Sequence, residues 1–252
     1  MKIMNSDISL LVHTCDAYEK FWAGMFYTLD FYWDYDFMQV YFANEEKDIN
    51  DIKYKCKGQY DYSPDKRIKQ ILTGKTDKNG FSTRFIHAVE KIPTKYVIYM
   101  QEDMWLTRSI DNDIITELIY FMEKNNADSV KIHTKLFYYD SYILEPTDNF
   151  IKGQKILKQS EIDGNMLLTH NATIWKRDYI LKHQKEGEDP WTNEIEGSKR
   201  MNSDTHSNWM YNIHWYCQPG ISVNGEFSHE HINYPHIIDE MMSMNLKYNL
   251  KK

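Results

Sequence analysis

The chain has 252 residues, of which 42% are hydrophobic and 27% charged, a composition typical of a folded protein with a sizeable core. The formal net charge is −7 and the basic residues are scattered, which argues against a phosphate-coating nucleic-acid surface. The three cysteines, Cys15, Cys56 and Cys217, are widely separated, so neither a disulfide framework nor a structural zinc site is expected.

No apolar run reaches the ~18 residues that a membrane span needs, and the first residues are polar. We therefore expect no signal peptide and no membrane span, and a protein of the reducing cytoplasm.

The first part of the sequence alternates between strand and helix patterns. Residues 8–13 form an apolar run typical of a strand buried on both faces, and apolar residues then recur at helical spacing from Tyr18 to Leu29. Asp16 is placed to cap this helix. A second strand over 37–42 would complete a right-handed βαβ unit.

The alternation continues to residue 133. The sequence predicts a short strand at 68–72, a helix at 81–92, a strand at 96–100, a helix at 110–124 and a strand at 129–133. The helix at 81–92 should stop at Pro93. Such alternation predicts an α/β fold with a mostly parallel central sheet.

The pattern changes in the second half. Residues 136–144 and 166–175 are predicted as antiparallel strands, and a helix is expected from Asp189-Pro190 to about Met201. We expect a single domain over 1–252, with a nucleotide-binding half at about 8–133, an acceptor-binding half at about 134–236 and a C-terminal tail at 237–252.

The best-placed acidic pair is Glu102-Asp103, which directly follows the most apolar strand. Ligands of open α/β sheets bind outside the carboxyl ends of the strands. Carboxylates there suit Mg²⁺ or Mn²⁺, whose coordination a diphosphate would complete. The alternative interpretation is two solvated acids in a turn.

Residues 96–103, Tyr-Val-Ile-Tyr-Met-Gln-Glu-Asp, resemble the metal-binding element of the GT-A glycosyltransferases, whose acidic motif follows a buried strand. Here only two acids remain, so the metal would either bind weakly or need a further ligand from elsewhere in the chain. The resemblance implies a Rossmann-like fold that binds a nucleotide sugar. It also implies donor-binding roles for Thr14 and Asp16 after the first strand, for Glu45 at the polar end of the second, and for Asp77 near the third.

The segment Gly187-Glu188-Asp189-Pro190-Trp191 is similar to the acidic element that starts an acceptor-side helix in inverting members of that family. This similarity implies that Asp189 is the general base, with Glu188 as the alternative. Because Asp189 precedes a proline favoured in the first helical turn, it is also a natural N-cap, and both interpretations stay open.

Other candidates surround these motifs. Lys199 and Arg200 could face a diphosphate or could belong to a solvated helix face that also carries Glu194 and Glu196. Trp191 is the aromatic residue best placed to contact an acceptor. His229 and His231 are candidate further metal ligands, since alternate strand residues share a face; the alternative is a structural role for each.

These features favour a glycosyltransferase that moves a sugar from a nucleotide-diphosphate sugar, with a UDP-sugar preferred, to a hydroxyl acceptor such as a glycan, assisted by Mn²⁺ or Mg²⁺. A non-catalytic nucleotide-sugar or carbohydrate-binding protein of the same fold is the alternative from another class. A nucleotidyltransferase is the alternative enzyme, but no glycine-rich phosphate loop follows the first strand.

Overall fold

The computed structural model describes residues 7–36, 38–51, 54–55, 61–62, 64–77, 79–133, 144–160, 166–213, 215–216, 221–223 and 226–227. Its helices are α1 (Glu19–Tyr32), α2 (Phe81–Glu90), α3 (Asn112–Lys124), α4 (Arg177–Lys182) and α5 (Pro190–Asn202), with short 3₁₀ turns at Asp16–Tyr18 and Ile49–Asp51. No helix in these ranges combines the length and apolarity that a membrane crossing requires.

A ten-stranded sheet runs through the molecule in the order β5-β2-β1-β6-β11-β7-β12-β10-β8, with β9 paired to β10. Its strands are β1 (Ile8–His13), β2 (Gln39–Asn44), β5 (Lys69–Leu72), β6 (Tyr96–Gln101), β7 (Ser129–His133), β8 (Leu144–Glu145), β9 (Phe150–Ile151), β10 (Gln154–Gln159), β11 (Thr173–Lys176) and β12 (Asn208–Asn212). Two small hairpins stand apart: β3 (Tyr54–Lys55) with β4 (Asp61–Tyr62), and β13 (Ser222–Val223) with β14 (Glu226–Phe227).

The direction of the strands is mixed. β5, β2, β1 and β6 are mutually parallel, as the βαβ pattern predicts. β11 is antiparallel to both of its neighbours, β6 and β7. Because β11 comes from the second half of the sequence and lies between two strands of the first half, the two predicted halves share one sheet.

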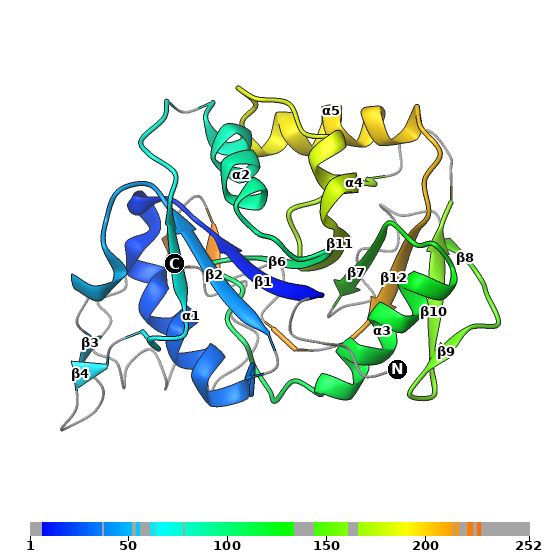
Figure 1. Ribbon diagram of the computed structural model, residues 1–252, viewed down its shortest axis with the longest axis horizontal. Coiled ribbons are helices and arrows are strands. Elements are labelled where there is room, and N and C mark those ends of the chain that lie inside the picture. Colours follow the sequence, from blue (N-terminus) through cyan, green and yellow to red (C-terminus); the bar gives the residue numbers. More distant parts are fainter. Residues whose placement is uncertain are drawn as a thin grey trace.

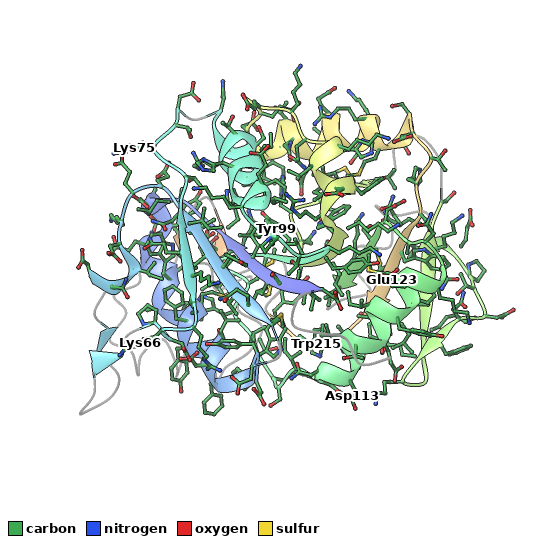
Figure 2. All side chains as sticks on the ribbon, in the orientation of Figure 1. Lys66, Lys75, Tyr99, Asp113, Glu123 and Trp215 are labelled. Carbon is green, nitrogen blue, oxygen red and sulfur yellow. The ribbon has the colours of Figure 1, made fainter. Side chains whose placement is uncertain are left out.

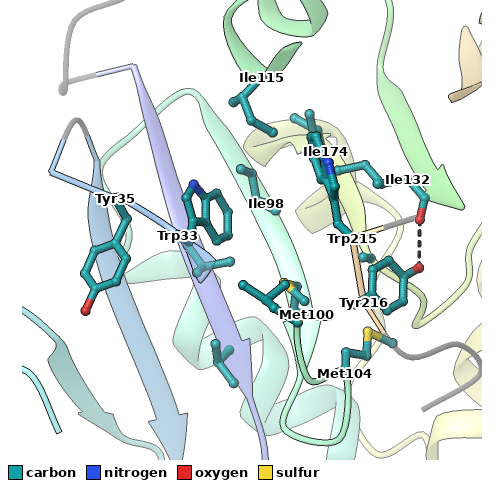
Figure 3. Packing of buried hydrophobic residues seen from close by; sticks show 14 of the residues in the cluster. Trp33, Tyr35, Ile98, Met100, Met104, Ile115, Ile132, Ile174, Trp215 and Tyr216 are labelled. Atoms are coloured by element: carbon teal, nitrogen blue, oxygen red, sulfur yellow. Dashed lines mark hydrogen bonds between the residues drawn. The ribbon is translucent and has the colours of Figure 1, made fainter. Parts of the chain in front are cut away.

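Helices cover both faces of this sheet (Figure 1). Alternate residues of each buried strand point to opposite faces, so Leu10 and Ile98 pack in the cluster that includes α1 and α3, whereas Leu11 and Val97 pack in the cluster that includes α2, α4 and α5. Figure 3 shows the first cluster, where the hydroxyl of Tyr216 donates a hydrogen bond to the carbonyl of Ile132 at 2.7 Å.

Several predicted elements differ from the structure. The strand expected at 166–175 is confined to Thr173–Lys176, because the preceding residues form a loop that packs under α5. The helix expected from residue 110 begins at Asn112, because the Asp111 side chain caps it by accepting a hydrogen bond from Asp113 N. Most of the strand expected at 136–144 lies outside the described residues, and β10 and β12 were not predicted.

Candidate active site

The carboxyl ends of the four parallel strands meet at one edge of the sheet. Thr14 follows β1, Glu45 follows β2, and Glu102 follows β6. Hydrogen bonds join the loops between them: Thr14 N donates to Ala43 O at 2.9 Å, and Gly74 N donates to Glu45 O at 3.0 Å. This edge is where open α/β sheets bind their ligands.

Glu102 and Asp103 lie side by side at this edge. Glu102 is only 5% exposed, and burial, with a further effect from Asp103, raises the pKa of its carboxyl group well above the usual value. Asp103 is anchored near β13: its Oδ2 accepts a hydrogen bond from Ser222 Oγ at 2.6 Å, and its main-chain oxygen accepts one from Ile221 N at 3.0 Å.

The acidic pair fits a divalent cation. Among the described residues no lysine or arginine forms an ion pair with Glu102, and two adjacent carboxylates in a buried position repel each other when both are ionised. A hard cation with oxygen ligands removes that repulsion. Two carboxylates are only part of a coordination sphere, however, and the described parts of the chain contain no group of three or more metal-ligating side chains. His229 and His231, the predicted further ligands, lie outside the described residues.

Cys15 and Tyr18 border the acidic pair and were not predicted as site residues. Burial, followed by the charge of Glu102, raises the pKa of the Cys15 thiol to about 11, so this thiol stays protonated at neutral pH. Burial also raises the pKa of the Tyr18 phenol, with smaller effects from Cys15 and Glu102. Tyr18 is 36% exposed, which leaves an aromatic ring at the rim of the site.

Asp16 fastens the loop after β2 to the end of β1. Its carboxylate accepts hydrogen bonds from Asn44 Nδ2 at 2.9 Å and from the main-chain nitrogens of Glu45, Glu46 and Lys47 at 3.2, 3.0 and 3.1 Å. The predicted helix-capping role differs from this arrangement, because Asp16 itself begins a 3₁₀ turn and Tyr18 occupies the N-cap of α1. Asp16 therefore shapes the loop that the nucleotide was expected to contact.

Glu45 and Arg84 form a buried ion pair beside this loop. Arg84 Nη1 lies 3.2 Å from Glu45 Oε1, and Glu45 Oε2 accepts a hydrogen bond from Asp16 N at 3.1 Å. Arg84 comes from α2 and also donates to Thr76 Oγ1. The sequence interpretation omitted this guanidinium, although its partner Glu45 belongs to the predicted donor site. Arg84 is hard to identify from the sequence, because a single arginine on an amphipathic helix usually lies on the solvated face.

Thr14 and Asp77 have different surroundings. The Thr14 hydroxyl accepts a hydrogen bond from Trp22 Nε1 at 2.9 Å and donates one to the carbonyl of Cys15 at 3.3 Å, and the Thr14 side chain partly offsets the raised pKa of Glu102. Asp77 is exposed, and its carboxylate accepts a hydrogen bond from Asn79 N at 3.0 Å in the turn before α2. Thr14 thus lies within the site, whereas Asp77 shapes a loop outside the acidic pair.

Asp189 is the partly exposed N-cap of α5. Its Oδ1 accepts hydrogen bonds from Trp191 N and Thr192 N, each at 3.0 Å, and its Oδ2 accepts one from Thr192 Oγ1 at 2.6 Å. These bonds, led by the Thr192 hydroxyl, lower the pKa of the Asp189 carboxyl group. The capping interpretation is therefore realised, and the same bonds make the carboxylate less basic. The neighbouring Trp191 is 76% exposed.

Glu188 is buried and paired. Arg200 Nη1 and Nη2 donate to its two carboxylate oxygens at 2.8 Å each, and Asn193 Nδ2 adds a further bond at 2.8 Å. Its main-chain nitrogen donates to Ser82 Oγ at 2.9 Å, which ties this loop to the first turn of α2. Arg200 is thus engaged with Glu188, while Lys199 forms an exposed i,i+3 pair with Glu196, as the solvated-face alternative predicted.

A second polar cluster lies between the sheet and α5. Lys131 on β7 is buried and donates to the carbonyl of Met166. Glu194 on α5 is half-buried, and its Oε1 accepts a hydrogen bond from His170 N at 2.6 Å. Burial raises the pKa of the Glu194 carboxyl group and lowers the pKa of the His170 imidazole to about 3. The buried phenol of Tyr99 lies in the same region (Figure 2).

No protein-family model matches the sequence, and no curated protein matches it significantly. Solved structures do match in fold. S. aureus TarS has a TM-score of 0.50 and 11% identity, covering 83% of this chain and 36% of TarS. The TarS 1–349 structure has a TM-score of 0.50 and 10% identity, covering 83% of this chain and 59% of that one. A CMP:2-keto-3-deoxy-manno-octonic acid synthetase complexed with CTP also has a TM-score of 0.50 and 10% identity, covering 86% of this chain and 93% of the synthetase.

TarS is a GT-A-like glycosyltransferase, and TarS 1–349 has also been solved with UDP and with UDP-GlcNAc. The predicted fold class, an α/β protein with a mostly parallel, partly mixed sheet of the GT-A or Rossmann-like type, is confirmed. The chain spans less than two thirds of either TarS structure, and at these identities the likeness concerns the fold.

Proposed function

We propose that this protein transfers a sugar from a nucleotide-diphosphate sugar, with a UDP-sugar preferred, to a hydroxyl acceptor such as a glycan. The observation that carries the proposal is the buried Glu102 with its neighbour Asp103 at the carboxyl end of β6. Burial and the neighbouring Asp103 disfavour the charged form of Glu102, and a bound cation would offset this effect. The phosphates of a nucleoside diphosphate would coordinate the same cation.

In this proposal Glu102 and Asp103 hold Mn²⁺ or Mg²⁺, which, when bound, would offset the charge that develops on the leaving diphosphate. Arg84 supplies a second positive charge near the edge of the sheet, held in place by Glu45. The loop that Asp16 fastens, with Thr14, forms the wall for the nucleoside, and the exposed ring of Tyr18 can stack on a base or on a sugar face.

The structural neighbours support this proposal through their own ligands. TarS, which shares the fold at a TM-score of 0.50, is a glycosyltransferase whose complexes contain UDP and UDP-GlcNAc. The synthetase was solved with CTP. The same sheet architecture thus holds pyrimidine nucleotides in two different proteins, and we extend that use to the edge that carries Glu102.

Metal-dependent binding of UDP tests the proposal. UDP titrated into the wild-type protein should bind in the presence of MnCl₂ and not in EDTA. The Asp103→Ala protein should bind UDP no better with MnCl₂ than with EDTA. Glu196→Gln is the matched control, because Glu196 is an acid that pairs with Lys199 on the solvated face of α5. Wild-type protein that binds UDP equally well with and without metal would refute the assignment of the acidic pair.

A nucleotidyltransferase is the second candidate, favoured by one observation: the match to the CTP-bound synthetase covers 93% of that chain. The loop after β1, Thr14-Cys15-Asp16, has no glycine for close approach to a triphosphate, which favours glycosyl transfer. The two reactions release different products. A glycosyltransferase releases UDP from a UDP-sugar, whereas a nucleotidyltransferase releases pyrophosphate from a nucleoside triphosphate.

A further inference from the structure

We infer that Glu194, in the second turn of α5, is the carboxylate that receives the proton of the acceptor hydroxyl. This inference rests on the proposed function and assigns a catalytic residue that differs from Asp189. It starts from the position of Glu194, which the sequence interpretation treated as part of a charged helix face.

The Glu194 side chain is oriented toward the sheet. His170 N, in the loop before β11, donates to its Oε1 at 2.6 Å. No described residue donates a hydrogen bond to Oε2. One oxygen is thus fixed by the main chain, and the other is left to interact with a hydroxyl group.

Glu194 lies at the same end of β6 as the acidic pair. The Tyr99 ring packs in the cluster that includes residues of α2 and α5, and its centroid lies 5.8 Å from that of the His170 ring. Besides burial, the charges of Glu102, Glu194 and Asp103 all raise the pKa of its phenol. Thr173, at the start of β11, pairs with Tyr99 near the carboxyl end of β6, so the preceding loop with His170, which holds Glu194, lies at the same end of β6 as Glu102 and Asp103.

The surroundings of Glu194 favour a base. His170 N, from the loop before β11, is hydrogen-bonded to it, and the charged or titratable groups that interact with it electrostatically are Lys131 from β7 and Tyr99 from β6. Burial raises the pKa of Glu194, and Lys131 opposes this effect. A raised pKa increases the strength of a carboxylate as a base, which is how enzymes adapt glutamates to neutral pH.

Asp189 has the opposite properties. Its two oxygens accept three hydrogen bonds, and its pKa is lowered. Taking a proton would require it to weaken the cap of α5. Among the described residues, the Glu194 side chain accepts one hydrogen bond, from His170 N, and it caps no helix.

The proposed step is a single displacement at the anomeric carbon of the donor sugar. The acceptor oxygen forms a bond to that carbon as the bond from the carbon to the diphosphate oxygen breaks. The nucleoside diphosphate leaves with the electron pair of the broken bond, and the proton of the acceptor hydroxyl moves to Glu194. When water is the acceptor, the same step is donor hydrolysis.

Hydrolysis of UDP-sugars therefore tests the inference without knowledge of the natural acceptor. UDP release from a panel of UDP-hexoses and UDP-N-acetylhexosamines is measured with MnCl₂ for the wild type, Glu194→Gln, Asp189→Asn and Glu196→Gln. The amide oxygen that Glu194→Gln introduces can still accept the bond from His170 N, and Asn still caps a helix. Glu196→Gln makes the same chemical change on the solvated face of the same helix.

We expect Glu194→Gln to lower UDP release by about 10²–10⁴-fold, the usual contribution of a general base, with UDP affinity unchanged. Its loss of rate should be accompanied by loss of the acid limb of the pH profile, and added formate should partly restore Glu194→Ala. We expect Asp189→Asn to lose less than about tenfold. A Glu194→Gln protein with wild-type rates, or an Asp189→Asn protein with the larger loss, overturns the inference while leaving the proposed function standing.

Failure of the proposed function has a different signature. A wild-type protein that does not bind UDP with Mn²⁺, or that binds it and releases UDP from none of the UDP-sugars, refutes sugar transfer and the role of Glu194 with it. Both results are obtained before any variant is compared.

Discussion

Replacing Glu102 with glutamine should make the metal-free protein more stable while it abolishes stabilisation by metal. Glu102 is 5% exposed and lies next to Asp103, and its raised pKa means that the folded state disfavours its charged form. Glutamine has nearly the same shape and no charge. The substitution therefore removes the repulsion within the pair together with one of the two proposed metal ligands.

The expected gain is about 1–2 kcal/mol in the free energy of unfolding, inside the usual range for a point substitution. For a chain of this size that is about 2–8 °C in Tm. The free energy of unfolding of the wild type should rise by about 2.7 kcal/mol when metal and UDP are present at 100 times the Kd of the metal–UDP complex. Glu102→Gln should not show this rise. The order of stability of the two proteins should thus reverse when metal and UDP are added.

The effect also has a defined dependence on pH. Because the pKa of Glu102 is higher in the folded state than in the unfolded state, its destabilising contribution is fully present above the folded pKa. That contribution disappears as the pH falls toward the unfolded value of about 4.3. The advantage of Glu102→Gln in EDTA should therefore be largest at pH 8 and should shrink on acidification.

Urea unfolding in EDTA at pH 8 and pH 5, repeated with MnCl₂ and UDP, measures these differences. Glu45→Gln is the matched control: Glu45 is also buried at this edge but is paired with Arg84 at 3.2 Å, so its replacement should destabilise the protein in both conditions. A Glu102→Gln protein that is less stable than the wild type in EDTA at pH 8 would contradict the reasoning.

Three further predictions concern single side chains. The buried imidazole of His170 has a pKa of about 3, so below about pH 6.5 the unfolded chain takes up a proton at this residue that the folded protein does not. The free energy of unfolding, measured in urea, should therefore fall with decreasing pH, and His170→Gln should reduce this slope by about 1.4 kcal/mol per pH unit. Gly24→Ala should lower Tm despite the ~1 kcal/mol helix preference for alanine, because its Cβ would lie 1.8 Å from Trp105 Cζ2 and overpacking typically costs about 1–3 kcal/mol. Asp189→Ala should cost about 1 kcal/mol in thermal unfolding through loss of the cap, and Asp189→Asn should restore it.

The parallel part of the sheet could be predicted because its strands are continuous apolar runs. The six residues of β1 are buried, as are five of the six in β6. A continuous apolar run therefore indicates that both faces of each strand are covered. β10 was missed for the opposite reason. β10 carries Lys155 and Lys158 and lies near the edge of the sheet, where half-buried side chains weaken the apolar signal.

The candidate site was predictable where a residue directly follows a strong strand, as Glu102 and Asp103 do. It was not predictable where the decisive fact is which way a helical side chain turns. Glu194 and Glu196 are two residues apart on α5, yet Glu194 packs toward Lys131 whereas Glu196 pairs with Lys199 in solvent. Their spacing alone indicates a charged helix, and only the packing of α5 on the sheet distinguishes the half-buried acid that His170 N contacts from the solvated one.

The antiparallel strand β11 explains why residues so distant in sequence meet at one edge. At the carboxyl edge of a set of parallel strands, the loops are those that follow each strand. Because β11 runs the other way, with Thr173 paired to Tyr99 and Lys176 paired to Tyr96, the loop that precedes it arrives at that same edge. This loop carries His170, whose main-chain nitrogen holds Glu194. The reversed strand therefore brings the loop that holds Glu194 to the edge that carries the acidic pair, an arrangement that an all-parallel sheet would have to build from the loops after its strands.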